Sequence, residues 1–318
     1  MKKALVTGAA GFLGSHLCDE LLEKGYEVIG IDNFFRGKKE NVNPKVILNE
    51  MDLVNENTIP YMENIMKDVD IVFHYAAING TEYFYDIPTK VFNDNIEITK
   101  NVLKAIKGSN VKKVVYTSTS EVYGDKPPLP TPESHMIQLN VFSDRDSYAS
   151  SKAIGEFYVK YYCMEYKIDY LILRPFNTYG TRMDNTKYGQ VVPEFFRKLQ
   201  DDEFTIIGDG TQTRSFCHVD DHKRLSVMLS ENVSNDVVNI GNDEQITILE
   251  LAEKVHNVDG HTFNPSFLPP RDYDTQRRQP DIIKIKTLFP DYKFITIDEG
   301  LRRMKWNQLV LYNQVEIT

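Results

Sequence analysis

The stretch Thr7-Gly8-Ala9-Ala10-Gly11-Phe12-Leu13-Gly14 sets the architecture of this chain. It follows a short apolar run and leads directly into a helical pattern over residues 12–24, which predicts a strand, a tight turn and a helix. Gly8 permits the turn, Gly11 lets the backbone approach a pyrophosphate, and Gly14 lets the helix pack closely on the strand. The stretch therefore predicts a dinucleotide site at a helix N-terminus, with a purely structural glycine turn as the alternative.

The first half of the chain repeats this alternation of strand and helix. Candidate strands cover residues 4–7, 27–32, 46–50, 71–75, 113–117 and 170–173, and candidate helices cover residues 12–24, 57–67, 89–109 and 147–166. Strands that alternate with helices of this length are typical of parallel sheets with helices on both faces. We therefore expect an α/β fold with a doubly wound, mostly parallel sheet of the Rossmann type.

The alternation loosens after Arg174-Pro175. The remaining pattern predicts helices near 190–201 and 247–256 and a strand over 214–219, followed by a proline-rich stretch. We expect a smaller lobe that closes over the carboxyl ends of the strands, where doubly wound folds bind ligands. The predicted dinucleotide-binding domain comprises residues 1–176 and 215–245, and the predicted substrate lobe comprises residues 177–214 and 246–318.

Composition limits the class of protein. The 318 residues include 37 basic and 46 acidic side chains, for a formal net charge of −9, which disfavours nucleic acid or an anionic membrane as partner. Cys18, Cys163 and Cys217 lie far apart without a C-x-x-C pair, which favours a reducing compartment and argues against a structural metal site. The N-terminal apolar run is too short for a signal peptide. We expect a soluble cytosolic protein without a metal.

An acidic residue ends the second candidate strand. Asp32 lies 18 residues after Gly14, where its carboxylate accepts hydrogen bonds from the adenosine ribose and repels a 2′-phosphate. This favours NAD over NADP as the cofactor. Arg36, Lys38 and Lys39 follow and have the charge to bind a 2′-phosphate, but a solvated loop is the preferred interpretation of that run.

Two later strand ends complete the expected cofactor site. Asp52-Leu53 follows the third strand and is placed to meet adenine, and His74-Tyr75-Ala76-Ala77 ends the fourth with small residues that let the cofactor pass. His74 itself is expected to be a packed, hydrogen-bonded residue.

A tyrosine and a lysine four residues apart supply candidate chemistry. Tyr148 and Lys152 project from one face of the helix predicted over 147–166. Lowering the pKa of a tyrosine from about 10 to ~7 takes about 4 kcal/mol, which an adjacent ammonium and a nicotinamide cation can supply together. The fifth strand ends in a run of hydroxyls over residues 116–124, among which we choose Thr119 to hydrogen-bond the reacting oxygen. The set predicts oxidation of an alcohol.

Seven motifs occur in the order expected of one enzyme family. They are T-G-A-A-G-F-L-G, D-N-F-F-R-G, H-Y-A-A, T-S-T-S-E-V-Y-G-D, Y-A-S-S-K, L-R-P-F-N-T-Y-G and G-D-G-T-Q-T-R-S-F-C-H-V-D-D. Over nearly its whole length the chain resembles the extended short-chain dehydrogenase/reductases that act on nucleotide sugars. The resemblance implies NAD as cofactor, a nucleotide-diphosphate sugar as substrate and a homodimer paired through the helices near 89–109 and 147–166.

The resemblance also implies roles for individual residues. Thr119, Tyr148 and Lys152 match the catalytic triad, Asn95 matches a structural asparagine near the cofactor, and Arg214 and Arg277-Arg278 match positions near the diphosphate. The residues expected to contact NAD are Gly8, Gly11, Phe12, Leu13, Asp32, Asn33, Asp52, Leu53, Ala76, Asn95, Tyr148, Lys152 and Pro175. Those expected to contact the substrate are Thr81, Ser120, Asn177, Arg182, Arg214 and Arg278.

The arginines have a physical reason to lie at a diphosphate. Arg271, Arg277 and Arg278 interrupt an otherwise acidic chain, and planar guanidinium groups form paired hydrogen bonds to phosphate oxygens. A solvated loop is the alternative interpretation of this run.

The reaction that follows C4 oxidation stays open at this stage. Dehydratases of the resembled family carry Asp-Glu after the catalytic threonine, whereas this chain has Ser120-Glu121, which disfavours a 4,6-dehydratase. Ser-Glu is similar to the UDP-glucuronate decarboxylases, yet residues 144–151 and the loop over 80–85 depart from their pattern. We expect an epimerised or 4-keto nucleotide sugar, with decarboxylation as the alternative and a non-catalytic NAD-sensing protein as the alternative of another class. Glu121 is either an acid/base residue or a supporting one.

Overall fold

The fold is built on a seven-stranded sheet in the order β11-β6-β5-β4-β1-β2-β3, and every pairing within it is parallel. The computed structural model describes residues 1–143, 145–184, 190–201, 203–270 and 276–305. The sheet strands are β1 (Lys3–Thr7), β2 (Glu27–Asp32), β3 (Ile47–Glu50), β4 (Ile71–His74), β5 (Lys113–Thr117), β6 (Asp169–Pro175) and β11 (Asp236–Ile240). The chain leaves β1 for β2 and β3 on one side, then crosses to β4, β5 and β6 on the other. A crevice therefore opens at the carboxyl ends of β1 and β4.

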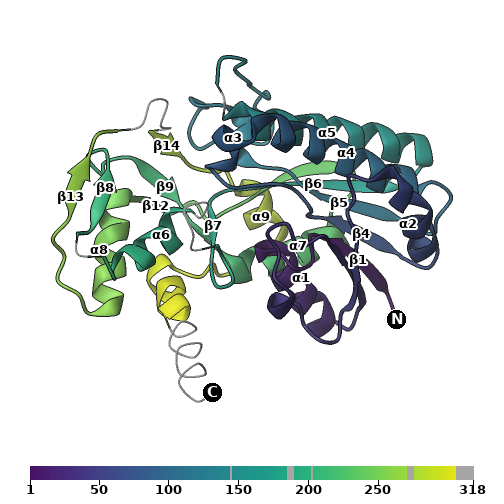
Figure 1. Ribbon diagram of the computed structural model, residues 1–318, viewed down its shortest axis with the longest axis horizontal. Helices are drawn as coiled ribbons and strands as arrows, with labels where there is room; N and C mark the ends of the chain where they lie inside the picture. Colours follow the sequence, from purple (N-terminus) through teal and green to yellow (C-terminus); the bar gives the residue numbers. More distant parts are fainter. Residues whose placement is uncertain (144, 185–189, 202, 271–275, 306–318) are drawn as a thin grey trace.

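Helices cover both faces of this sheet (Figure 1). One face carries α1 (Phe12–Glu23) and α7 (Val219–Asn232), and the other carries α2 (Ile59–Met66), α4 (Pro88–Ile106) and α5 (Asp146–Tyr166). Because both faces are covered, the central strands are mostly apolar, and β4 is buried along its whole length. The expected doubly wound α/β class is confirmed. Short turns η1 (Lys39–Asn41), η2 (Glu56–Thr58), η3 (Ser120–Tyr123) and α3 (Tyr83–Asp86) complete this part.

Two elements of this lobe, α7 and β11, are absent from the sequence-based expectation. The buried face of α7 mixes Asp221, His222 and Ser226 with Leu225 and Leu229, which weakens the apolar stripe that marks a helix in sequence.

The smaller lobe packs its own core beside the sheet (Figure 1). Its elements are α6 (Val191–Lys198), α8 (Ile248–Asp259), the parallel pair β8 (Thr205–Ile207) and β13 (Ser266–Leu268), and the three strands β12 (Gln245–Thr247), β9 (Thr213–Ser215) and β14 (Arg277–Arg278). The predicted strand over 214–219 is in fact two, β9 and β10 (Cys217–His218). Ser215 pairs in the lobe, whereas Cys217 pairs with β7 (Thr178–Tyr179), so the chain changes sheets at Phe216.

The predicted lobe boundary at residues 246–318 is wrong for one segment. Helix α9 (Ile283–Leu288) packs against the large sheet, with Ile285 buried in the core that contains α1 and α7. Lys284 pairs with Asp236 of β11 at 2.8 Å, and the backbone N–H of Ile295 donates to Asp221 of α7. The chain thus returns to the first lobe after β14.

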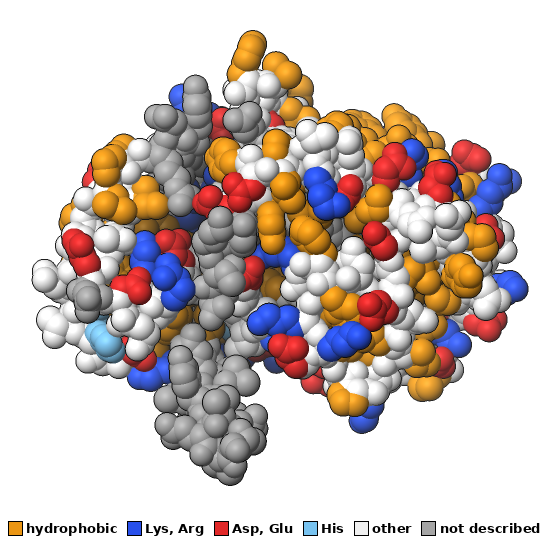
Figure 2. All heavy atoms as spheres, in the orientation of Figure 1, with side chains coloured by type: hydrophobic (Ala, Val, Ile, Leu, Met, Phe, Trp, Pro, Cys, Tyr) orange, Lys and Arg blue, Asp and Glu red, His pale blue; other side chains and the backbone are white. Residues whose placement is uncertain are grey.

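Positive and negative side chains alternate over the face shown in Figure 2. Within the described ranges, no helix combines the length and apolar character needed to cross a bilayer.

Candidate active site

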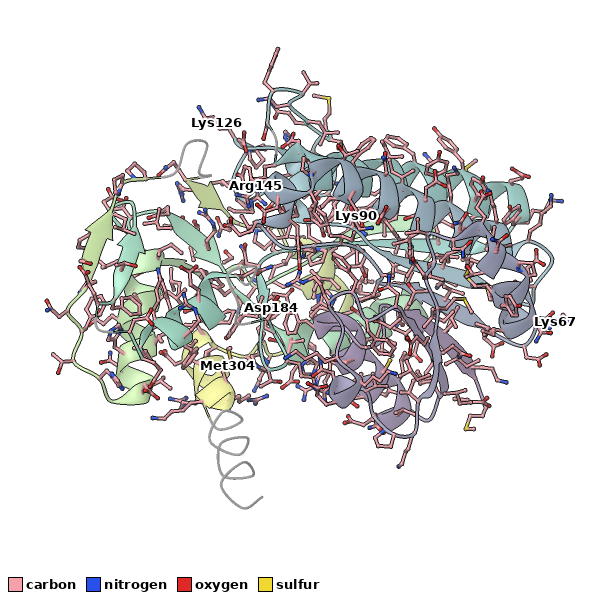
Figure 3. The ribbon with its side chains drawn as sticks, in the orientation of Figure 1. Lys67, Lys90, Lys126, Arg145, Asp184 and Met304 are labelled. Carbon is pink, nitrogen blue, oxygen red and sulfur yellow. The ribbon has the colours of Figure 1, made fainter. Side chains whose placement is uncertain are left out.

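A cavity of about 1380 Å³ lies between the two lobes at the carboxyl ends of the sheet strands. Figure 3 shows four residues of its wall: Lys90 and Arg145 come from the sheet lobe, while Asp184 and Met304 come from the segments on the other side. Residues at the ends of β1, β2, β4, β5 and β6 line it together. The cavity lies where the sequence pattern predicts the cofactor and the substrate.

Most of the predicted site residues line this one cavity. They are Gly8, Gly11, Phe12, Leu13, Asp32, Asn33, Asp52, Leu53, Ala76, Thr81, Thr119, Ser120, Glu121, Tyr148, Lys152, Pro175, Asn177, Arg182 and Arg214. Asn95, Arg277 and Arg278 are the exceptions among the described residues. Asn95 and Arg278 are buried just behind the wall, whereas Arg277 of β14 is exposed. Arg271 lies outside the described residues.

The glycine turn has the geometry that a pyrophosphate requires. Gly8 has φ +72°, and a Cβ there would lie 2.9 Å from the backbone nitrogen of Ala76. A Cβ on Gly14 would lie 2.0 Å from the carbonyl oxygen of Gly8, so the helix can approach the turn this closely only because residue 14 is glycine. Helix α1 begins at Phe12 with no side-chain cap and no acidic residue in its first turn, which leaves its N-terminal N–H groups for an anionic ligand.

Backbone hydrogen bonds fix the carboxylate of Asp32 at the end of β2. Its Oδ2 accepts a hydrogen bond from the N–H of Ala10 at 2.9 Å, and its Oδ1 accepts one from Phe34 at 2.7 Å. Burial raises the pKa of this carboxyl, although backbone hydrogen bonds oppose the shift. Each oxygen keeps a further lone pair for a ribose hydroxyl, so the residues present fit NAD.

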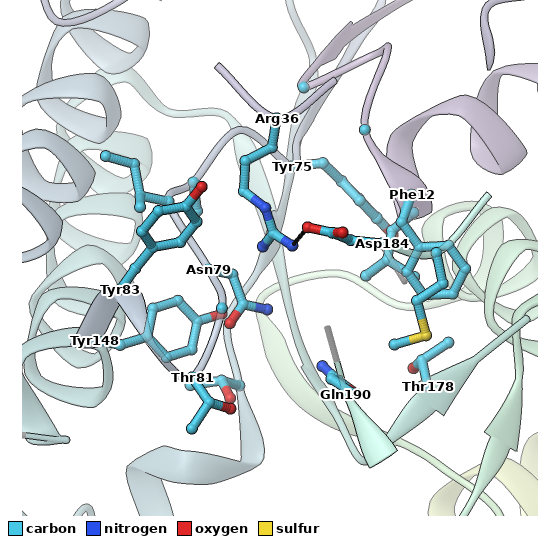
Figure 4. Close-up of a pocket in the computed structure, with 18 of the residues that line it drawn as sticks. Phe12, Arg36, Tyr75, Asn79, Thr81, Tyr83, Tyr148, Thr178, Asp184 and Gln190 are labelled. Carbon is cyan, nitrogen blue, oxygen red and sulfur yellow. Dashed lines mark hydrogen bonds and ion pairs between the residues drawn. The ribbon is translucent and has the colours of Figure 1, made fainter. Parts of the chain in front are cut away.

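Arg36 crosses the cavity instead of facing solvent. Its Nη2 lies 2.8 Å from Oδ2 of Asp184 on the opposite side (Figure 4). Its guanidinium also lies 5.5 Å from the ring centroid of Tyr83. The preferred interpretation of a solvated loop was therefore wrong for Arg36, because a partner 148 residues away is invisible to local pattern. Lys39 does lie at the surface, where it pairs with Glu50.

The proposed catalytic residues converge at one end of the cavity. Tyr148 and Lys152 come from the first turns of α5, and Thr119 caps η3 directly after β5. All three are more than nine-tenths buried. Burial lowers the pKa of Lys152 to about 7, with the Glu156 carboxylate opposing the shift.

The pKa of Tyr148 is raised above its ordinary value. Burial is the main cause, and the Glu121 carboxylate adds to it, while a hydrogen bond with Thr119 and the charge of Arg36 act in the opposite direction. The protein's own groups therefore keep the Tyr148 hydroxyl protonated at neutral pH. A phenolate at this position depends on the positive charge that the oxidised nicotinamide brings.

An aromatic residue outside the sequence-based set supports Tyr148. The ring of Phe84 in α3 stacks on the ring of Tyr148, with centroids 5.0 Å apart and planes within 10°. Ile78 and Val91 complete this small apolar cluster. In the sequence, the loop over 80–85 stands out only as a departure from the resembled pattern, and its aromatic content is the signal that could have found Phe84. Figure 4 shows Tyr148, Asn79, Thr81 and Tyr83 on the same side of the cavity.

Two arginines hold Glu121. Arg145 donates from Nε and Nη2 to both carboxylate oxygens at 3.1 Å, and Nη1 of Arg278 lies 2.8 Å from Oε1. Burial raises the pKa of Glu121, but the two guanidinium charges outweigh burial and lower it to about 2. Glu121 is consequently an anion throughout the physiological range, which favours the supporting role over the acid/base role.

The other expected ligands have protein partners in the structure. Asn95 accepts from the N–H of Ile78 at 2.7 Å and donates to Ser151 at 3.1 Å, so it braces the loop after β4 against α5. Asn177, with φ +38°, donates to the carbonyl oxygen of Ser215. Arg182 pairs with Asp19 of α1 at 2.8 Å.

Comparison with known proteins identifies the family. Residues 4–241 match the NAD-dependent epimerase/dehydratase family, and this range includes the glycine turn, Asp32, Thr119, Tyr148 and Lys152. This chain belongs to the NAD-dependent epimerase/dehydratase family. The expected extended short-chain dehydrogenase/reductase class and the NAD cofactor are confirmed.

Relatives of this epimerase/dehydratase chain include decarboxylases and epimerases. UDP-glucuronic acid decarboxylase 1 of Danio rerio is 35% identical over 95% of this chain and 71% of its own length. UDP-N-acetyl-alpha-D-glucosaminuronate decarboxylase of Bacillus cytotoxicus is 32% identical over 96% of this chain and 97% of its own. The structure of UDP-glucose 4-epimerase with UDP-glucose from Thermotoga maritima aligns with a TM-score of 0.89 at 31% identity, covering 97% of this chain and 99% of its own.

Proposed function

We propose that this protein oxidises C4 of a UDP-linked uronic acid with NAD, releases the carboxyl group as carbon dioxide and reduces the C4 ketone again. The observation that carries the proposal is the ionised Glu121 held between Arg145 and Arg278 beside Thr119 and Tyr148. The two decarboxylase relatives, each matched over 95% of this chain or more, support the same reaction.

The protein groups account for the oxidation step. The glycine turn and Asp32 would hold NAD, which would supply the hydride acceptor for C4 oxidation and the hydride donor for the final reduction. Tyr148 takes the proton of the C4 hydroxyl, the charge of Lys152 stabilises the resulting phenolate, and the Thr119 hydroxyl donates to the substrate oxygen. Phe84 and the buried position of Tyr148 exclude water from this proton transfer.

The charge state of Glu121 bears on the step after oxidation. Loss of water from the sugar needs an acid that protonates the leaving hydroxyl, and a carboxyl with a pKa of about 2 is not such an acid. Loss of carbon dioxide needs none. Once C4 is a ketone, the carboxylate on C5 is that of a β-keto acid. The C5–carboxylate bond breaks and its electron pair moves to the C4 oxygen, which gives an enolate and carbon dioxide. The C4 carbonyl then re-forms as C5 takes up a proton from solvent.

The local charge suits a carboxylate-bearing sugar. Arg145 and Glu121 are part of the cavity wall, and a guanidinium group forms paired hydrogen bonds to a carboxylate. A uronate carboxylate therefore finds a cation beside the catalytic residues, whereas Arg278 serves to keep Glu121 ionised from behind. We therefore propose that Arg278 lies nearer the sugar than the diphosphate, for which Arg214 remains our candidate.

C4 epimerisation is the second candidate. It is favoured by the alignment with UDP-glucose 4-epimerase over 97% of this chain and by a cavity volume of about 1380 Å³. Epimerisation uses the same oxidation step but requires the 4-keto sugar to present its other face before reduction.

The two candidates differ in the mass of the product. We would incubate the protein and NAD separately with UDP-glucuronate, UDP-N-acetylglucosaminuronate, UDP-glucose and UDP-N-acetylglucosamine, then analyse products by mass spectrometry and proton NMR. Loss of carbon dioxide from a uronate is the expected result, with Tyr148→Phe as the inactive control. An unchanged mass with altered ring couplings on every substrate would replace the first candidate with the second.

The proposal includes assembly and location. We propose a homodimer through α4 and α5, because Phe157, Tyr161 and Met164 of α5 are 50%, 58% and 61% exposed and form a stripe at helical spacing. Figure 2 shows hydrophobic side chains along the upper edge of the molecule, where α5 runs. Size-exclusion chromatography with light scattering, compared with Tyr161→Glu, tests this assembly. Three buried cysteines without disulfide bonds support a cytoplasmic location.

A further inference from the structure

The ammonium of Lys152 lies against an aromatic ring that belongs to neither the cofactor cradle nor the catalytic set. Its Nζ is 4.2 Å from the ring centroid of Tyr116, which is the last residue but one of β5 and is fully buried. The Tyr116 hydroxyl donates to the backbone carbonyl oxygen of Lys152 at 3.3 Å. One side chain thus contacts both the backbone and the charged end of the lysine.

The packing holds the Tyr116 ring in one place. A Cβ on Gly155, one turn after Lys152 on α5, would lie 2.0 Å from the Tyr116 hydroxyl oxygen, so only glycine leaves room for it. On the other side, the His74 ring lies 5.5 Å from the Tyr116 ring. The closeness of α5 to β5 at this point therefore depends on the pairing of a tyrosine with a glycine.

The other ionisable groups around Lys152 do not replace this contact. His74 of β4 is hydrogen-bonded to Thr7 and Thr99, and burial, with a smaller effect of Lys152, lowers its pKa to about 3, so it is neutral. On α5 itself, Tyr148 is the catalytic partner. The carboxylate of Glu156, also on α5, is engaged by Arg174.

We propose that Tyr116 is a positioning residue whose ring face stabilises the ammonium of Lys152 and aims it at Tyr148. A cation over an aromatic face within about 6 Å is attracted by the ring quadrupole, and the attraction is strongest where water is excluded, as it is here. The inference rests on the proposed function in one respect, because it assigns Tyr116 to the Lys152 and Tyr148 pair that carries C4 oxidation.

The consequence concerns the pH range in which Lys152 is charged. Its pKa is about 7, so near neutrality any loss of attraction converts the ammonium to a neutral amine. A neutral amine does not stabilise the phenolate. Weakening the ring quadrupole should therefore move the alkaline limb of the activity profile to lower pH.

A series of phenylalanines with increasing fluorine content tests this without changing the packing. The reference is Tyr116→Phe, which keeps the ring face and removes the hydroxyl, followed by 4-fluoro-, 3,5-difluoro- and 3,4,5-trifluorophenylalanine at position 116. We expect the alkaline limb of kcat to move down stepwise, by about one pH unit for the trifluoro ring relative to phenylalanine. An alkaline limb at the same pH throughout the series would overturn the proposal.

A second measurement does not depend on turnover. In the protein without substrate, labelled with ¹³C at lysine Cε, the Lys152 signal is assigned by its loss in Lys152→Met and titrated by NMR for each ring. A Lys152 pKa that falls with each fluorine supports the proposal even if no UDP-sugar is converted. A Lys152 pKa that is constant across the series, in proteins with equal melting temperatures, refutes it whatever the substrate proves to be.

Discussion

Replacing Glu156 by glutamine should destabilise the protein far more than the loss of one charge at its surface. Glu156 lies on α5, and its carboxylate accepts hydrogen bonds from Arg174 Nε at 2.8 Å and Nη2 at 2.6 Å. Ser118, directly after β5, donates a third at 2.5 Å. The side chains of Glu156 and Arg174 are only 6% and 5% exposed. This pair therefore fastens α5 to β5 and β6 inside the protein.

The loss in free energy of unfolding depends on the group that the substitution leaves unpaired, which is the guanidinium group of Arg174. Removing one partner of a buried ion pair costs roughly 3–5 kcal/mol, because the remaining charge is uncompensated in a medium of low polarity. Arg174 keeps its proton in this variant, because an arginine in a protein is effectively always protonated. Glutamine keeps the shape of the side chain and one acceptor oxygen. We therefore expect Glu156→Gln to lower the free energy of unfolding by about 3 kcal/mol, near the lower end of that range.

The assay is urea unfolding at pH 7, followed by far-ultraviolet circular dichroism. The matched control is Glu50→Gln, which breaks the Lys39–Glu50 pair at 3.0 Å, where the two side chains are 68% and 64% exposed. The control should change the free energy of unfolding by less than about 1 kcal/mol. If Glu156→Gln falls within about 1 kcal/mol of that control, the buried pair does not carry the stability assigned to it.

Three other contacts give predictions of their own. For Glu121→Gln, the difference in unfolding free energy from the wild type should be largest above pH 4.5 and should narrow as the pH falls towards 2. The reason is that Glu121, whose pKa is lowered to about 2, contributes stability only while its carboxyl group is ionised. Urea unfolding at pH 7, 4 and 3 measures this difference, and a value independent of pH contradicts the prediction. For Asp32→Asn, calorimetry should show NAD bound about 10- to 100-fold more weakly and NADP gaining relative to NAD, whereas an unchanged preference would remove Asp32 from the ribose site. Gly155→Ala should lower the free energy of unfolding by about 1–3 kcal/mol because the added Cβ meets the hydroxyl of Tyr116, and Tyr116→Phe should restore part of that loss. An equal loss of unfolding free energy with tyrosine and with phenylalanine at position 116 argues against the clash.

The glycine turn and the Tyr148 and Lys152 pair were predictable because residues close together in the sequence determine their geometry. The turn over residues 7–14 needs glycines at fixed spacing, and Tyr148 and Lys152 share a face because they lie four apart on a helix. Helix α7 was missed because polar side chains share its buried face with leucines, which weakens its apolar stripe. Strand β11 was missed although its sequence is an apolar, β-branched run. The segment around α9 was assigned to the wrong lobe because the side on which a short amphipathic helix packs is a property of the tertiary fold.

Local sequence was sufficient for the parallel sheet, the dinucleotide turn and the acidic residue at β2, since each depends on neighbours within a few residues. It also singled out Thr119, Tyr148 and Lys152, which line one cavity in the structure. The folded chain was needed to show that Arg278 lies beside Ser120 across 158 positions of sequence, that Arg36 meets Asp184, and that Phe84 and Tyr116 flank the reacting pair. These contacts are made where separate strands end at one edge of the sheet. Their partners are chosen by chain topology and close packing, which no local pattern encodes.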